Sequence, residues 1–133
     1  MQNKIEEKKE KVLGREDFLN LPKPIIKKAF IKTLEAYTFV KQMTAQEQDT
    51  YEESLYIMNT KSDNTVEMIR QMAGLKAKYL VRVLCDENGK RFFKDEEWEV
   101  LSNKFADVIS ELFNEVTKIN RDTMEDLKEQ EKK

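Results

Sequence analysis

The sequence has 133 residues, which is the size of one ordinary domain. Hydrophobic residues make up 39% of it and charged residues 38%, so a small core is expected, and the formal net charge is -2. The absence of histidine and the single cysteine, Cys85, exclude histidine-based nucleophilic catalysis and thiolate zinc sites. We therefore expect no enzymatic activity and no metal or cofactor.

The N-terminus and the apolar runs predict the location of the protein. Charges occupy the first ten residues, where a signal peptide would need its apolar centre, so export by that route is not expected. The longest apolar run is far shorter than the roughly 20 residues that cross a bilayer, so no membrane span is expected. A lone cysteine suits a reducing cytosol. These features favour a cytoplasmic protein.

The first segments of the chain predict a flexible arm and then a strand. Residues 1–12 mix lysine and glutamate with few apolar side chains, which is typical of a flexible charged arm. A single domain is expected over residues 13–120. It begins with Phe18, Leu19 and Leu21, which anchor the chain before Pro22 and Pro24. Because proline disfavours helix in the residue before it, an extended segment should follow.

Residues 25–43 predict a β-hairpin. Ile25–Lys32 and Tyr37–Met43 are rich in β-branched and aromatic residues, and four residues separate them. The alternation in the first strand is imperfect, so a helix over residues 25–36 is the alternative.

Two helices are predicted next, over residues 45–59 and 65–84. Thr44 and Glu47 form a capping-box pattern before the first, in which Tyr51, Leu55 and Met58 recur at helical spacing. Gly74 is expected inside the second helix at a cost of about 1 kcal/mol. The apolar face of the second helix would consist of Val66, Ile69, Ala73, Ala77, Leu80 and Leu84.

The last predicted helix covers residues 96–120 and follows an Asn-Gly turn and a cap at Asp95. Its buried face would consist of Phe105, Val108, Ile109, Leu112, Val116 and Ile119. Residues 121–133 are expected to form a frayed or disordered charged tail. The predicted fold class is thus mainly α with a small N-terminal β-hairpin (α+β), a compact helical domain with charged flexible termini.

Three segments resemble the tail assembly chaperones of long-tailed bacteriophages or of related prophage tail-like particles. They are Arg15–Leu19 with Leu21-Pro22, Val40–Asp49, and Val83–Glu97, whose "CDENG" turn is followed by a phenylalanine pair and acidic residues before the last helix. The third segment is the most specific of the three. The resemblance spans roughly residues 13–120.

The resemblance implies a cytoplasmic chaperone that the phage makes in its host and that is absent from the mature virion. Such a protein would bind the helical tape measure protein, keep it soluble and help recruit tail tube protein. In many members a frameshift adds a C-terminal extension that recruits the tube protein, and Lys132-Lys133 is compatible with an adenine-rich slippery codon run. Self-association is common in the family and is compatible with this sequence.

Met68 and Met72 are candidate partner-binding residues. Methionine provides adaptable apolar contacts, and the six methionines include four in the hairpin exit and the two following helices. Most methionines are ordinary core residues, and this alternative is favoured for any single one. Met68 is the better candidate because it lies off the predicted face of Val66, Ile69 and Ala73.

Phe92 and Phe93 are a second candidate pair. Neighbouring residues in an extended segment point to opposite sides, so one ring can enter the core while the other stays exposed. The favoured expectation is nevertheless that the last helix and Trp98 cover both rings. Cys85 follows Leu84 at a helix end and is expected to be a small buried hydrophobe.

An apparent calcium loop is rejected. Asp86, Asn88 and Glu97 occupy positions 1, 3 and 12 of an EF-hand frame, but Arg91 stands where the loop requires glycine and Lys90 occupies a ligand position. No calcium site is expected.

A nucleic-acid surface is also rejected. Lys23, Lys27, Lys28 and Lys32 surround Phe30 without an acidic neighbour, as on a basic surface with an aromatic platform. The negative net charge opposes this, and a solvated lysine face that blocks edge pairing explains the same residues.

The predicted function is therefore that of a non-enzymatic tail assembly chaperone. The alternative is a small prophage-encoded regulator or inhibitor that binds a host protein, since it would share the size, acidity and lack of catalytic residues. A carboxylate-based hydrolase would need two buried carboxylates in one cleft, whereas the acids here are expected on solvated helix faces.

Overall fold

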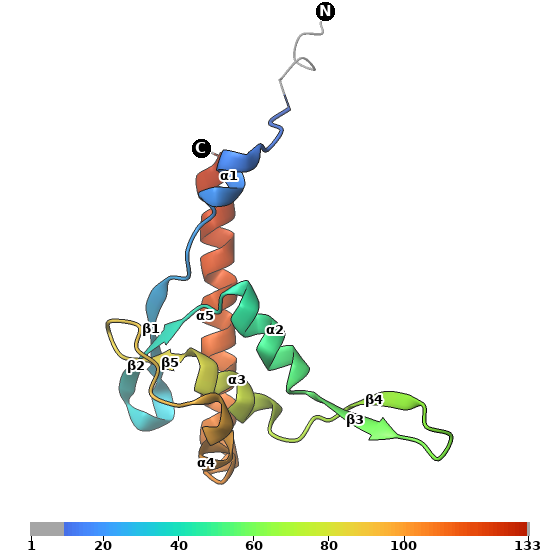
Figure 1. Ribbon diagram of the computed structural model, residues 1–133. Helices are drawn as coiled ribbons and strands as arrows, with labels where there is room; N and C mark the ends of the chain where they lie inside the picture. Colours follow the sequence, from blue (N-terminus) through green and yellow to red (C-terminus); the bar gives the residue numbers. More distant parts are fainter. Residues whose placement is uncertain (1–9, 133) are drawn as a thin grey trace, which may run out of the picture.

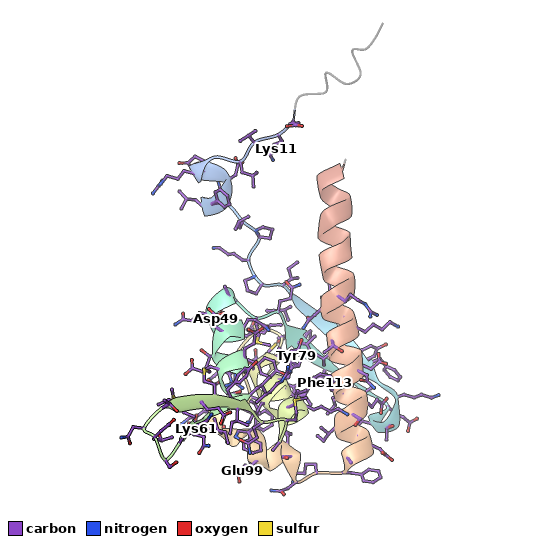
Figure 2. The ribbon with its side chains drawn as sticks, turned by 90° about the vertical axis from the view of Figure 1, so that its right-hand side faces the viewer. Lys11, Asp49, Lys61, Tyr79, Glu99 and Phe113 are labelled. Atoms are coloured by element: carbon purple, nitrogen blue, oxygen red, sulfur yellow. The ribbon has the colours of Figure 1, made fainter. Side chains whose placement is uncertain are left out.

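The computed structural model describes residues 10–132, with side chains described as far as Arg121. The N-terminal segment of residues 1–12, predicted to be flexible and charged, lies mostly outside the described residues. The first element is a short helix, α1 (Arg15–Leu19), whose first turn is capped because Gly14 N donates to the Asp17 carboxylate at 2.8 Å. None of its residues is buried. In Figure 2, α1 stands apart from the remainder of the described chain.

The predicted N-terminal hairpin is confirmed. Strands β1 (Ile26–Ile31) and β2 (Ala36–Lys41) pair antiparallel, with Ile26 opposite Lys41 and Ile31 opposite Ala36. A 3-10 turn, η2 (Lys32–Leu34), and a left-handed Glu35 connect them. The alternative of a helix over residues 25–36 is therefore wrong. The two-residue strand β5 (Leu84–Cys85) completes a sheet of order β1-β2-β5.

Helix α2 (Ala45–Glu53) begins with the predicted capping box. Glu47 N donates to Thr44 Oγ1 at 3.1 Å, and Thr44 N donates to Glu47 Oε1 at 2.9 Å. Two orphan backbone donors are thereby satisfied at once. The helix ends at Glu53, earlier than the predicted Asn59, because the chain then enters a second hairpin.

This second hairpin overturns the predicted fold class. Residues assigned to two helices instead form β3 (Tyr56–Thr60) and β4 (Val66–Arg70), an antiparallel two-stranded sheet. Residues 10–132 thus contain five strands in two sheets, spread from Ile26 to Cys85, and do not form a mainly α fold with one N-terminal hairpin. The local reason is the content of β-branched and aromatic residues, which outweighs an apolar spacing that also fits a helix.

Gly74 follows the hairpin and is the N-cap of helix α3 (Leu75–Val83). Its φ of 71° is left-handed, and a Cβ built on it would lie 2.5 Å from the ring of Trp98. The predicted helix over residues 65–84 is therefore wrong: Gly74 is the N-cap of α3, where glycine alone has both the conformation and the space.

The last predicted helix is also divided. It consists of a 3-10 turn η3 (Asp95–Glu97), a short α4 (Trp98–Ser102) and a long α5 (Ala106–Lys132). Phe105 lies in the break before α5 and is exposed, contrary to the prediction that it is buried. The predicted end at Asn120 is wrong as well, since α5 continues to Lys132 through the segment expected to be a frayed tail.

The core lies where the three-stranded sheet, α3 and α5 meet. Its fully or nearly buried residues are Ala29, Ile31, Val40, Leu80, Val83, Leu84, Ile109 and Val116. Cys85 is buried as predicted, and burial raises the pKa of its thiol. Figures 1 and 2 show α5 running past this core, so that its C-terminal part extends beyond the sheet and the other helices of the body.

Within residues 10–132, no helix combines the length and apolarity that crossing a membrane requires. Among the described side chains, those of residues 10–121, no three His, Cys, Asp or Glu come together as they would around a metal ion.

Candidate partner-binding surface

The β3–β4 hairpin, called the arm below, is the candidate functional site. Its turn is closed by local hydrogen bonds: Lys61 N donates to Thr65 O at 2.8 Å, and Asp63 Oδ1 accepts from both Thr65 N and Thr65 Oγ1. Asn64 takes a φ of 70° in this turn, a conformation that asparagine tolerates better than most residues. The turn therefore fixes the register of the two strands.

The arm leaves the body of the molecule and packs chiefly on itself. β3 and β4 contact each other far more than they contact any other element, and Figure 1 shows them extending to the right of α2 and α3. All ten strand residues are exposed. A two-stranded hairpin that covers neither of its faces is only marginally stable in water.

Residues opposite each other in an antiparallel pair share a face, which assigns the side chains of the arm to two surfaces. Met58 lies opposite Met68, and their exposed fractions are 74% and 60%. The methionine face consists of Tyr56, Met58, Thr60, Val66, Met68 and Arg70. The isoleucine face consists of Ile57, Asn59, Glu67 and Ile69. Large apolar side chains are thus exposed on both faces.

Met72 lies at the root of the arm, outside β4. It is exposed and helps line a shallow groove of about 430 Å³ between the start of α3 and the start of α5. Ile109 and Ala106 line the same groove from α5. Met68 and Met72 are therefore both exposed, in contrast to the favoured alternative of a core position, but Met68 belongs to the free arm and Met72 to this groove.

Phe92 and Phe93 lie elsewhere, in the loop after β5. Phe92 is 59% exposed, while Phe93 packs against the core, so the favoured expectation that both rings are covered is wrong for Phe92. The alternation of an extended segment accounts for this split. Figure 1 shows this loop on the opposite side of the body from the arm. The structure therefore does not join Phe92 and the two methionines in one surface.

Met58 and Val66 are surface residues that the sequence analysis missed. Both were assigned to buried helix faces, yet both are exposed on the methionine face of the arm. The missed signal is the pair of apolar, β-branched runs on either side of the polar residues 61–65, which is the pattern of a hairpin.

A second apolar groove lies where the N-terminal segment meets α5. It has a volume of about 620 Å³ and is lined by Leu21–Pro24, Gln42–Ala45, Gln48, Tyr79 and Asn120. Tyr79 is held in place because its hydroxyl accepts from Asn120 Nδ2 at 2.7 Å and its ring contacts Phe113 edge-on, as Figure 2 shows. Burial raises the pKa of Tyr79, and the hydrogen bond from Asn120 partly opposes this.

A comparison with known families identifies the class of protein. Residues 28–133 match the model of the phage tail assembly chaperone family, a span that includes most of β1 and all later elements, the arm and α5 among them. The chain belongs to this family. Searches among curated proteins and among solved structures gave no match.

Proposed function

We propose that this chain binds the tape measure protein of its phage, keeps it soluble and helps recruit tail tube protein during tail assembly. The family supports a role in tail assembly, and the observation that supports binding of an apolar client is the arm. Both of its faces expose large side chains, and such patches on soluble proteins mark interaction sites.

The methionine face is well suited to a client whose sequence varies along its length. Methionine side chains are unbranched and polarizable, so Met58 and Met68 can adapt to different apolar partners. A helical segment could lie along the face with its apolar stripe on the two methionines. We further propose that tube recruitment requires a longer, frameshifted form, that the chaperone acts in the bacterial cytoplasm, that it has no catalytic activity, and that it is absent from the virion.

Co-expression with the tape measure protein of the same genome tests this function. We expect the tape measure protein to become soluble and to co-purify with the chaperone. The variant Met68→Asp should fold normally, because this side chain is exposed and no charge lies opposite it, but it should lose most of the co-purified tape measure protein. The measurement is the amount of soluble tape measure protein per chaperone.

A matched control places the same added charge on the arm away from the methionine face. Ser62 lies in the turn and Gln71 follows β4, and both are exposed. Either single variant, Ser62→Asp or Gln71→Glu, should retain binding. A tape measure protein that stays insoluble beside folded wild-type chaperone would overturn the proposed function, and equal loss in Met68→Asp and the control variants would remove the methionine face from it.

A further inference from the structure

A buried arginine lies under α2, outside the arm and both grooves. Arg82 of α3 is 3% exposed, and its guanidinium carbon lies 5.8 Å from the centre of the Tyr51 ring. Its Nη1 donates to Lys78 O at 2.7 Å. Its Nε has no hydrogen-bond partner among the described residues. A buried donor left in this way carries a full desolvation cost, so a missing acceptor is indicated.

The charges around Arg82 do not balance. Asp95 lies 2.6 Å from Arg91 Nη2 but 3.7 Å from Arg82 Nη2, so the carboxylate is committed mainly to Arg91. Arg91 also donates twice to Val81 O, at 3.1 and 2.9 Å. Two guanidinium groups thus share one carboxylate. Burial and the charge of Arg91 lower the pKa of Arg82, while Asp95 raises it.

The other acid that lines this cluster, Glu47, already has partners. Glu47 pairs with Lys41 at 3.2 Å and accepts the hydrogen bond from Thr44 N in the capping box. The pair of Glu47 and Lys41 is therefore neutral as a unit. One positive charge, shared between Arg82 and Arg91, has no counterion in the described part of the chain.

A small cavity of about 140 Å³ opens at this cluster. It is bounded by Gln46, Glu47 and Thr50 of α2 and by Arg82, Arg91 and Asp95. Guanidinium and amide N–H groups provide donors in its wall, which suits a planar oxyanion. Because Glu47 and Asp95 are acids in the same wall, a group with one negative charge is favoured over a dianionic phosphate.

We propose that this cavity binds a single carboxylate group, which accepts hydrogen bonds from Arg82 and Arg91. Two sources have this chemistry: a small free carboxylate, and an Asp or Glu side chain of a partner protein. The site is independent of the arm and of the proposed tape measure binding, so either can fail without the other.

The Arg82 Nε–H signal in a ¹H–¹⁵N NMR spectrum tests the proposal on the full-length protein. Acetate and the blocked amino acid acetyl-glutamate methylamide are titrated against chloride at constant ionic strength and neutral pH. We expect a saturable downfield shift of this signal with carboxylate and none with chloride. Saturation by both compounds at similar concentrations would leave the site open to a protein side chain, and saturation by acetate alone would assign it to small free carboxylates.

The isosteric variant Asp95→Asn sharpens the test because it removes the competing carboxylate without changing side-chain size. It should bind acetate at least several-fold more tightly than the wild type. As a control, Asp107→Asn removes one exposed charge in the first turn of α5 and should leave acetate binding unchanged. A signal that does not move in the wild type or in Asp95→Asn, or that moves equally with chloride, would overturn the proposal.

Discussion

The molecule contains two hairpins of similar length with opposite surroundings. In β1–β2, Ala29, Ile31 and Val40 are buried in the core that α3 and α5 complete, whereas all ten strand residues of β3–β4 are exposed. Local β-propensity is sufficient to describe both hairpins, but only the first is stabilised by tertiary packing. The difference indicates that β1–β2 belongs to the scaffold and that the arm is available to a partner.

The largest effect that this comparison predicts is on the free energy of unfolding. Ile31→Ala removes a side chain that is 1% exposed and should destabilise the protein by about 2–5 kcal/mol. Met58→Ala removes one that is 74% exposed and should change stability by less than about 0.5 kcal/mol. Urea denaturation of both variants measures the two values. Similar losses of stability in the two variants would mean that the arm is packed against other residues in solution and is not an exposed surface.

The sequence predicted the first hairpin and its junction with α2 because the signals there are local. Residues 22–24 fix an extended entry, the strands are rich in β-branched and aromatic residues, and Thr44 with Glu47 caps the next helix within one turn. Each of these features acts over a few residues. They could therefore be read without knowledge of the tertiary structure.

The arm was missed because its apolar residues satisfy two periodicities at once. Leu55 and Met58, and then Val66 and Ile69, are three residues apart, as on a helix face, while Ile57 and Val66 also fit strands beside a polar turn. The helix predicted over residues 65–84 is also interrupted at Gly74, which is left-handed and has the ring of Trp98 in the space of a Cβ. That contact joins residues 24 positions apart and cannot be seen in the local pattern.

The candidate site was predicted only in part, for a related reason. Met68 was selected because it lay off a helix face, and its side chain is exposed although that helix does not exist. Met58 was missed because the same wrong periodicity placed it in the core. Whether a side chain of the arm is exposed depends on the absence of a covering element, and sequence periodicity does not report that absence.

A smaller effect is predicted at the boundary between the arm and the scaffold. Gly74→Ala combines a left-handed backbone with a Cβ placed 2.5 Å from Trp98, and it should destabilise the protein by about 1–3 kcal/mol. Gly14→Ala is the control, since nothing lies within 4 Å of its Cβ position. Thermal denaturation of both variants measures the difference. If Gly74→Ala is as stable as Gly14→Ala, the arm does not need a fixed exit angle.

The smallest predicted effect is on the pH dependence of the free energy of unfolding. It compares the carboxylate of Glu47 in the scaffold with that of Asp63 in the arm. Burial raises the pKa of Glu47, but hydrogen bonds from Thr44 and Lys41 outweigh it, and the net pKa lies below the ordinary 4.5. The pKa of Asp63 is also lowered, by hydrogen bonds from Thr65. Because a depressed folded-state pKa stabilises the fold above the unfolded value, this contribution is lost as the pH falls through the folded-state pKa.

Only the Glu47 contribution should appear in global unfolding, because the capping box joins β2 to α2, whereas Asp63 orders an exposed turn that can open by itself. Glu47→Gln retains the capping box but removes the ion pair with Lys41, so it should lower stability at pH 7 by about 0.5 kcal/mol and flatten the loss of stability below pH 4.5. Asp63→Asn should change neither the stability at pH 7 nor its loss at low pH. Urea denaturation from pH 3 to pH 7 measures the curves, and an equal change in both variants would mean that the arm unfolds together with the scaffold.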